Sequence, residues 1–499
     1  MSEPDHLAVN EESKNDDIVL LARLGYKQEL KREFSIVELF GFGFSVSAIV
    51  PSVASVLFYS LPNGGPSAMI WGWATSSVFL MFIAMAMAEL GLSAPTSGGL
   101  YYWTYKFSSP RCRNLLSWMV GYTNTISYIT GVAGVDWSCA TLIMAGASLG
   151  SDGTFVPTVH QTFGVYCAVL VCHAITAGCA TKVLAKLQYT FITINVALVL
   201  VMLVGLPAAT PAEFKNNARY AFGNFENITP WPNGYAFILS FLAPLVSGFD
   251  VGVHISEEAQ NANVAVPWAI ICVTAIGCTL GFAVQIAVAF CMGTDSIAIL
   301  SSPVQQPMAT ILLNSFGKKG MLAIWSFIFV ALYALNPLKC TALIGILVLW
   351  THSLFRFSRD GALPFSRFLY NINSFTGTPV RCVWRPFTLG VVGQYVANSI
   401  PITARYLGGQ EFKRGPFHLG AFSMPVAIIA VLWMWFMTVV LMFPTAPDPV
   451  PQTMNYTVVV MGGVLFLALG YYYLPRYGGV HWFNGPVSNI DGNVRSWLI

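Results

Sequence analysis

The sequence predicts an all-α membrane protein that crosses the bilayer many times and has two interrupted spans. Hydrophobic residues make up 55% of the 499 residues and charged residues only 9%, whereas soluble domains carry about 25% charged residues. Apolar runs of about twenty residues, the length that crosses a bilayer, recur along the chain. The first and sixth runs contain glycine and serine at positions where a continuous helix would be weakened.

Composition also excludes several classes of function. A net charge of +3 is too small to indicate a nucleic-acid partner. The ten cysteines fall mostly in apolar runs without CxxC spacing, so we expect neither a disulfide framework nor a metal site. The chain has no phosphate-binding glycine loop followed by Lys-Ser/Thr, no HExxH and no GxSxG. We therefore expect a protein that is not an enzyme and holds no cofactor, so any uphill transport must be secondary.

We divide the chain into a cytosolic N-terminal tail (1–34), a transmembrane domain (35–474) and a C-terminal tail (475–499). The polar, acidic start of the chain argues against a cleavable signal peptide. The predicted spans are 35–61, 66–90, 115–147, 160–180, 187–207, 234–253, 267–293, 320–350, 386–404, 419–444 and 454–474.

Basic residues set the predicted orientation. With the N-terminus in the cytosol, most lysines and arginines flanking the first eight spans fall on the cytosolic side, as positive-inside orientation requires. We expect an integral protein of the plasma membrane, with the vacuolar or another internal membrane as the alternative.

The first interrupted span is centred on the segment FGFGFSVSAIVPS, residues 40–52. Glycine and proline weaken the helical hydrogen-bond ladder, and serine offers the backbone a substitute partner. In lipid, such a break is tolerated only where the freed backbone groups face protein or a polar cavity. Half-helix ends carry partial charges that suit a carboxylate or a cation, so the break is a candidate ligand site. The alternative is close helix packing through small residues.

The second interrupted span carries the segment SGFDVG, residues 247–252. Breaks in spans one and six are the sign of a five-plus-five inverted repeat that holds its substrate between them. Asp250 lies in this break, and Asp136 lies mid-run in span three beside Trp137. A carboxylate at membrane depth is costly, so each acid needs a partner. That partner is either a cationic substrate group, with Phe249 or Trp137 stacked on it, or a helix end or serine hydroxyl of the protein.

Other charged residues suggest proton movement and gating. Lys339, beside Pro337 in the eighth run, is a buried titratable group, although it can also snorkel or reach backbone carbonyls. Glu257 and Glu258 follow the second break closely and fall near the cytosolic surface. There they either pair with basic residues to close the mouth or form a solvated acidic loop. The basic residues expected at that level are Lys31, Arg32 and Arg359.

A series of short motifs in a fixed order resembles the fungal amino acid/GABA/choline permeases of the amino acid–polyamine–organocation superfamily. The resemblance covers nearly the whole chain, from the segment before span one to the C-terminal tail. The motifs are LARLGYKQELKREFS, GFSVSAIVPSVAS, NGGPSAMIWGW, MAELGLSAPTSGGLYYW, TKVLAKLQ, SGFDVGVHISEEAQNA, SRDGALPFSRFLY, TGTPVR, RGPFHLG and WFNGPVSNID.

The resemblance implies a LeuT-like fold of twelve helices with a central site between the broken first and sixth helices, and proton-coupled uptake. Backbone N–H groups of the first break would bind a substrate carboxylate, at Ser45, Val46, Ser47 and Ala48. Phe249 would act as a gate over the site, and backbone around Asp250 and Val251 would receive the amino group. The substrate would be an amino acid, GABA, choline or a polyamine, and no residue decides among them.

The chain departs from the family in its ninth span. Family members have two spans between TGTPVR and RGPFHLG, whereas residues 386–404 here extend for about 28 Å, enough for one crossing. A single crossing would place Arg405 and the C-terminus outside, and a re-entrant hairpin would keep them inside. We expect eleven membrane-length helices, with 386–404 as one helix broken near Pro401. A non-transporting or ligand-sensing variant is the alternative function.

Overall fold

The structure is a computed structural model, and its described residues leave several gaps along the chain. They are residues 21–22, 35–96, 98–179, 181–241, 253, 256, 259–300, 306–343, 345–346, 391–412, 415, 417–443, 447 and 457–486.

The described residues are almost entirely helical. The first helices are α2 (Ile36–Ser47), α3 (Ile49–Ser60), α4 (Gly65–Ser93), α5 (Gly99–Phe107), α6 (Arg113–Gly150), α7 (Val159–Cys179) and α8 (Thr181–Leu200). They are followed by the π-helix η1 (Val201–Gly205), α9 (Leu206–Ala209), the 3₁₀-helix η2 (Ala212–Phe214), α10 (Ala218–Gly223), α11 (Asn233–Leu239), α13 (Ala262–Cys291), α14 (Ser296–Leu300) and α15 (Pro307–Thr341). Last come the parallel strands β1 (Ala342–Leu343) and β2 (Gly345–Ile346), then α19 (Val391–Leu407), η4 (Gly420–Phe422), α20 (Ser423–Met442), α21 (Thr457–Tyr472) and η5 (Gly479–His481).

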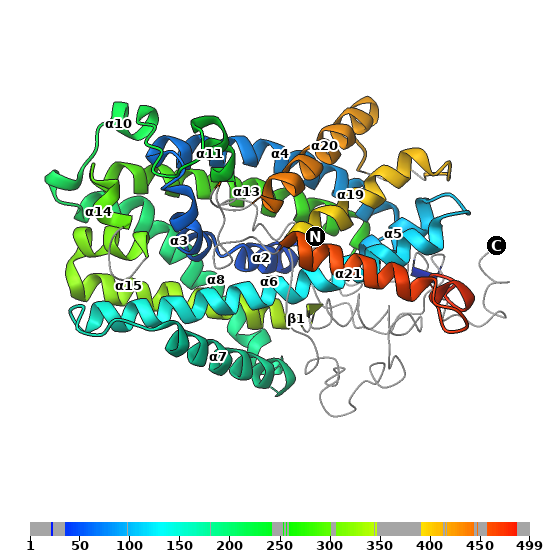
Figure 1. Cartoon of the computed structure of the whole chain (residues 1–499), viewed down its shortest axis with the longest axis horizontal. Coiled ribbons are helices and arrows are strands. Elements are labelled where there is room, and N and C mark those ends of the chain that lie inside the picture. The colour runs from blue at the N-terminus through cyan, green and yellow to red at the C-terminus, as the bar shows by residue number, and fades with distance from the viewer. Residues whose placement is uncertain are drawn as a thin grey trace, which may run out of the picture.

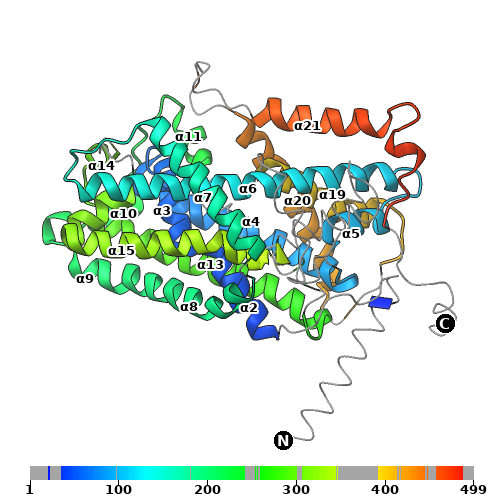
Figure 2. The ribbon, with the colours of Figure 1, turned by 90° about the horizontal axis from the view of Figure 1, so that it is seen from below.

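The long helices α4, α6, α13 and α15 run along the long axis of the molecule (Figures 1 and 2). We call one end of this bundle the α5 end, because α5 lies there with the last turns of α4 and α21. We call the other the α10 end, where α10, α14 and the start of α4 lie (Figure 1). Seven helices in the described part of the chain are long and apolar enough to cross a membrane. This confirms an all-helical protein with several spans, and the number of spans stays a prediction.

Two large apolar cores fill the bundle. The first packs α4, α5, α19, α20 and the first half of α13, with Trp103 and Met434 among its buried members. The second packs α3, the second half of α6, α8, α15 and the end of α13, with Leu57 and Trp325 among its members. Helix α2 contributes Leu39 and Val46 to the first core and Phe44 to the second, and Ala48 also belongs to the second. The interrupted span therefore lies between the two cores.

Helix α19 corrects one expectation for residues 386–404. It is a single helix that continues through Pro401, so the break expected there is wrong. Its seventeen described residues extend for about 25 Å. Arg405, near its C-terminal end, contacts Glu89 near the C-terminal end of α4. Helix α19 therefore ends at the α5 end of the bundle.

The last two helices follow from that placement. Helix α20 begins beside Glu89 at Ser423, and the chain after it brings Phe443 against Tyr235 toward the α10 end. Helix α21 returns to the α5 end, where Tyr472 packs with α5 and the start of α6. Helix α20 therefore runs away from the α5 end and α21 returns to it. The segment that precedes α19 lies outside the described residues, so the choice between a single crossing and a hairpin stays a prediction.

Candidate functional site

The break predicted in the first span is present at Ala48. Helix α2 begins with a capping box, in which Ser35 and Glu38 each bind the other's backbone N–H. It ends at Ser47, and α3 begins at Ile49. Ala48 between them has φ 35° and ψ 61°, the left-handed conformation that a residue with a Cβ adopts at a cost. A strained residue in a buried membrane segment indicates a functional break rather than a simple bend.

Serine side chains and Pro51 explain the break locally. The hydroxyl groups of Ser45 and Ser47 donate to the carbonyl oxygens of Gly41 and Gly43, both at 3.0 Å. Pro51 has no N–H to donate to the carbonyl of Ser47, four residues earlier. The Ser52 hydroxyl donates to that carbonyl instead, at 3.0 Å. The serines that marked the break in the sequence therefore satisfy its carbonyl groups.

Backbone donors lie at the start of α3. An α-helix has no internal partner for its first backbone N–H groups. At the start of α3 these belong to Ile49 and Val50, since Pro51 in the same turn has none. The predicted residues Ser45, Val46, Ser47 and Ala48 line this point and are all buried. The positive end of α3 can therefore receive an anionic group.

Asp136 has a buried partner that the sequence reasoning missed. Its Oδ1 lies 2.6 Å from Nδ1 of His173 on α7, and both side chains are buried. The other ring nitrogen of His173, Nε2, lies 3.2 Å from the carbonyl oxygen of Tyr333 on α15. The prediction that Asp136 needs a partner is therefore confirmed, although that partner is an imidazole rather than a serine or a helix end.

Trp137 points in a different direction from Asp136. It is 41% exposed and packs edge-on against Tyr166 of α7, with ring centroids 5.7 Å apart. Successive residues of a helix face about 100° apart, so burial of Asp136 turns its neighbour toward the perimeter. A ring at that perimeter is poorly placed to stack on a ligand at the break.

Most other predicted site residues lie outside the described residues. They are Phe249, Asp250 and Val251 of the second break, and the predicted gate residues Glu257, Glu258, Lys31, Arg32 and Arg359. The backbone of Lys339 belongs to α15, while its side chain is outside the described part of the chain.

A second buried acid, Glu89, joins three helices at the α5 end. Its Oε2 accepts from Arg405 Nη1 and Ser423 Oγ, both at 2.6 Å, and its Oε1 accepts from the backbone N–H of Leu419 at 2.9 Å. Arg405 also stacks on the ring of Phe412, 3.7 Å from its centroid. The sequence signal was an acid inside the predicted span 66–90, which requires a partner for the same reason as Asp136.

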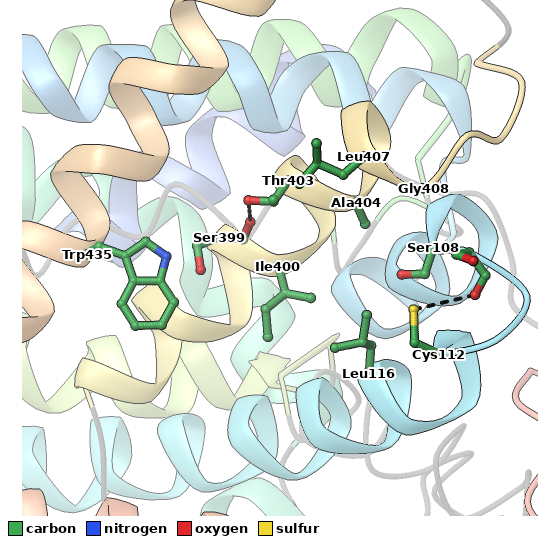
Figure 3. Close-up of a pocket in the computed structure, with 11 residues that line it drawn as sticks. Ser108, Cys112, Leu116, Ser399, Ile400, Thr403, Ala404, Leu407, Gly408 and Trp435 are labelled. Carbon is green, nitrogen blue, oxygen red and sulfur yellow. Dashed lines mark hydrogen bonds between the residues drawn. The ribbon is translucent and has the colours of Figure 1, made fainter.

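A cavity of about 290 Å³ lies between α19, α20 and the start of α6 (Figure 3). Its lining is mostly apolar, and Leu407 and Trp435 at its rim are exposed. Two of the polar groups shown there make local backbone bonds, since Thr403 Oγ1 donates to the Ser399 carbonyl and Cys112 Sγ to that of Ser109. The cavity contains no residue of the break and no predicted site residue. Its lining residues are Ser108, Ser109, Cys112, Leu116, Ser399, Ile400, Thr403, Ala404, Leu407, Gly408 and Trp435.

Comparison with known proteins identifies relatives over nearly the whole chain. An uncharacterized amino-acid permease of Schizosaccharomyces pombe is 35% identical to this chain over an alignment that spans 96% of this chain and 91% of the relative. The GABA-specific permease of Saccharomyces cerevisiae is 33% identical over 95% of this chain and 86% of its own. Amino-acid permease 2 of Neurospora crassa is 30% identical over an alignment that spans 95% of this chain and 91% of the relative. The crystal structure of a manganese transporter from Eremococcus coleocola superposes on 89% of this chain and 96% of the transporter chain. Its TM-score is 0.48 and its sequence identity is 12%.

The sequence family described as Amino acid permease matches residues 34–406, which include the break at Ala48 and helix α19. Secondary transport of amino acids is the activity of such a permease, and the apolar spans place it in a membrane. The resemblance first indicated by the motif series is therefore confirmed, and the chain belongs to the amino acid permease family, a family of transporters rather than enzymes.

Proposed function

We propose that the protein imports a small amino acid or a related amine across the plasma membrane by alternating access, and that protons drive the uptake. The observation that carries this proposal is the buried break at Ala48, where a span is interrupted without being exposed to lipid. Broken spans of this kind hold substrate near the bilayer midplane in secondary transporters. The N-terminus is cytosolic in this proposal, as positive-inside orientation requires.

The substrate carboxylate binds the start of α3. Ile49 and Val50 present backbone donors there, and the carbonyls of the preceding turn already have serine partners. The amino group is received by the second break, with Asp250 and the backbone of Val251 as its partners and Phe249 as the gate. GABA, which carries both a carboxylate and an amine, is the first probe because a GABA-specific permease is among the relatives.

Uptake in cells that lack their own transport systems tests this proposal. The panel contains labelled amino acids, GABA, choline and a polyamine, and surface delivery is checked with an epitope tag. A carboxylate site at α3 predicts that GABA or an amino acid enters and that choline and the polyamine, which have no carboxylate, do not. Entry of choline alone would assign the alternative substrate class, and failure of every substrate at normal surface delivery would refute the proposal.

The coupling ion is tested separately. Substrate uptake should stop when a protonophore collapses the proton gradient and continue when sodium is replaced. Uptake that survives the protonophore but requires sodium would contradict proton coupling while leaving the permease assignment intact.

The gate belongs to the same proposal. Glu257 and Glu258 close the cytosolic mouth by pairing with Lys31, Arg32 and Arg359. Exposed ion pairs are worth only about 0–1 kcal/mol, so Glu258→Lys should change exchange rates modestly. Unchanged uptake and exchange in this variant would remove the pair from the gate.

The single apolar run at residues 386–404 favours a second candidate function, a variant that binds ligand without moving it. The resemblance implies two spans in this region, and alternating access requires intact packing on both sides of the substrate site. Purified protein that binds labelled GABA but supports neither uptake nor exchange in vesicles would establish this function.

A further inference from the structure

We propose that Asp136 and His173 form the proton-binding site through which proton movement is coupled to substrate movement. This inference rests on the proposed proton-driven uptake and names the residues that carry the proton. It also predicts a property of the purified protein, reversible proton binding at this pair, that does not depend on any substrate.

The geometry fixes which ring nitrogen of His173 carries a permanent hydrogen. Nε2 lies 3.2 Å from the carbonyl oxygen of Tyr333, and a carbonyl can only accept, so Nε2 is the donor. That carbonyl is available because the residue four positions later, Pro337, has no N–H to offer it within helix α15. The prolines of α3 and α15 thus have the same consequence, because each frees a carbonyl that a side chain then binds.

With Nε2 fixed as a donor, the contact between Nδ1 and Asp136 Oδ1 holds one exchangeable proton. When this proton is present, the pair is neutral, either as carboxylic acid with imidazole or as carboxylate with imidazolium. When it has left for the aqueous side, a carboxylate and a neutral imidazole remain, and the pair carries one negative charge. The atoms balance without any further reactant, since the proton enters from one aqueous side and leaves to the other.

The surroundings make this change of charge consequential. Asp136 and His173 are both buried at membrane depth, where an uncompensated carboxylate is costly. The other titratable side chains that influence the site are Cys139 of α6, Tyr166 and Cys172 of α7 and Tyr333 of α15. None of these four side chains is an acid or an imidazole, so within the described part of this site the exchangeable proton is assigned to the contact between Asp136 and His173.

Packing connects the pair to the break at Ala48. Cys139 lies one turn after Asp136, and Val169 lies one turn before His173. Both belong to the same apolar core as Ala48 and Ile49, and α15, which carries the Tyr333 carbonyl, packs against α2 and α3. A change in how α6, α7 and α15 pack when the proton leaves therefore reaches the helix ends that receive substrate.

Vesicles containing the purified full chain test the coupling. Coupling to one proton permits about tenfold accumulation of a zwitterion for each unit of pH difference, with the membrane potential set to zero. With a pH difference of about two units, the unaltered protein should accumulate labelled GABA by up to about a hundredfold. Asp136→Asn and His173→Gln should accumulate none, yet both should still exchange internal for external GABA. Asp152→Asn is the matched control, since it makes the same chemical change in an exposed acid that pairs with Lys318.

Retained pH-driven accumulation in both site variants would overturn the inference while leaving proton-driven uptake standing. If the unaltered protein does not accumulate GABA, the proposed function fails with that probe, and proton binding decides the inference independently. Infrared difference spectra between acid and alkaline pH should then show carboxyl and imidazole bands that disappear in Asp136→Asn and His173→Gln but persist in Asp152→Asn. Spectra that are identical in all four proteins would overturn the inference as well.

Discussion

Removal of Arg405 is expected to destabilise the protein strongly, because it leaves Glu89 charged and buried. Glu89 is 2% exposed and Arg405 10%, and the guanidinium lies 2.6 Å from the carboxylate. Breaking one side of such a buried pair costs about 3–5 kcal/mol of unfolding free energy. Ser423 and the backbone N–H of Leu419 still donate to Glu89, which places Arg405→Ala toward the lower end of that range.

A double-mutant cycle isolates the pair itself. Glu89→Gln keeps an acceptor for Ser423 and Leu419 but leaves the guanidinium without its carboxylate. If the contact is real, Glu89→Gln combined with Arg405→Ala should cost less than the sum of the two single changes. The coupling free energy of residues in one such network is about 0.5–3 kcal/mol.

The stabilities of the wild-type protein and its variants are ranked by thermal unfolding in detergent. Size-exclusion chromatography measures the fraction of each protein that stays folded after heating. Arg405→Lys is an informative intermediate, because it keeps the charge but loses the planar stacking on Phe412. Lys318→Ala is the control, since its exposed pair with Asp152 should be worth at most about 1 kcal/mol. Additive costs for Glu89→Gln and Arg405→Ala would show that α19 does not end beside α4, which would refute the placement of that helix.

Three further predictions follow from backbone geometry and packing. Ala48→Gly should raise thermal stability by up to about 1 kcal/mol, because glycine adopts the left-handed conformation at φ 35° without strain; a clear loss of stability would argue against that conformation. Gly281→Ala should cost about 1–3 kcal/mol because its new methyl group would collide with the ring of Trp73. The control Gly134→Ala, which meets no atom within 4 Å, should be neutral or stabilising in the same unfolding assay. A C-terminal tag should be labelled only after cells are permeabilised, because α21 ends at the α5 end with the start of α6, whose flanking Lys106, Arg111 and Arg113 are cytosolic in the proposed orientation. Labelling of intact cells would contradict this arrangement.

Local features of the first span could be predicted from sequence because their causes lie within a few residues. Ser45, Ser47 and Pro51 each act on a residue about one helical turn away, and the break appears in the segment that they mark. The exact end of α2 could not be predicted, because it depends on which residue adopts the left-handed conformation, and the carboxylate donors at Ser45, Val46, Ser47 and Ala48 stay a prediction. The second break lies outside the described residues, so the paired arrangement stays a prediction.

The buried acids could be recognised from sequence, but their partners could not. Asp136 and His173 are 37 residues apart on different helices, and Glu89 and Arg405 are 316 residues apart. Helix periodicity contains no information about which faces of two distant spans meet. One sequence signal was available in hindsight, since Pro337 frees the carbonyl of Tyr333 and so requires a donor from another helix.

The end of α19 could not be placed from sequence. Counting residues in 386–404 allowed one crossing or a hairpin, and the segment before α19 lies outside the described residues. What the structure adds is the contact of Arg405, which pairs with Glu89 and stacks on Phe412 at the α5 end. That contact joins residues 316 positions apart, and no local pattern predicts it.

The arrangement of the two apolar cores supports separate roles for the two buried acid pairs in the proposed transport cycle. Glu89 and Arg405 join α4, α19 and α20 within the first core, and Asp136 and His173 join α6 and α7 beside the second. The first span contributes Leu39 and Val46 to the first core and Phe44 and Ala48 to the second, so its strained residue lies between the two packed bodies. Packed cores switch between discrete arrangements rather than deforming continuously. Relative movement of the two cores would therefore concentrate at Ala48, beside the donors of Ile49 and Val50, and a proton leaving Asp136 and His173 would alter the packing of one core only.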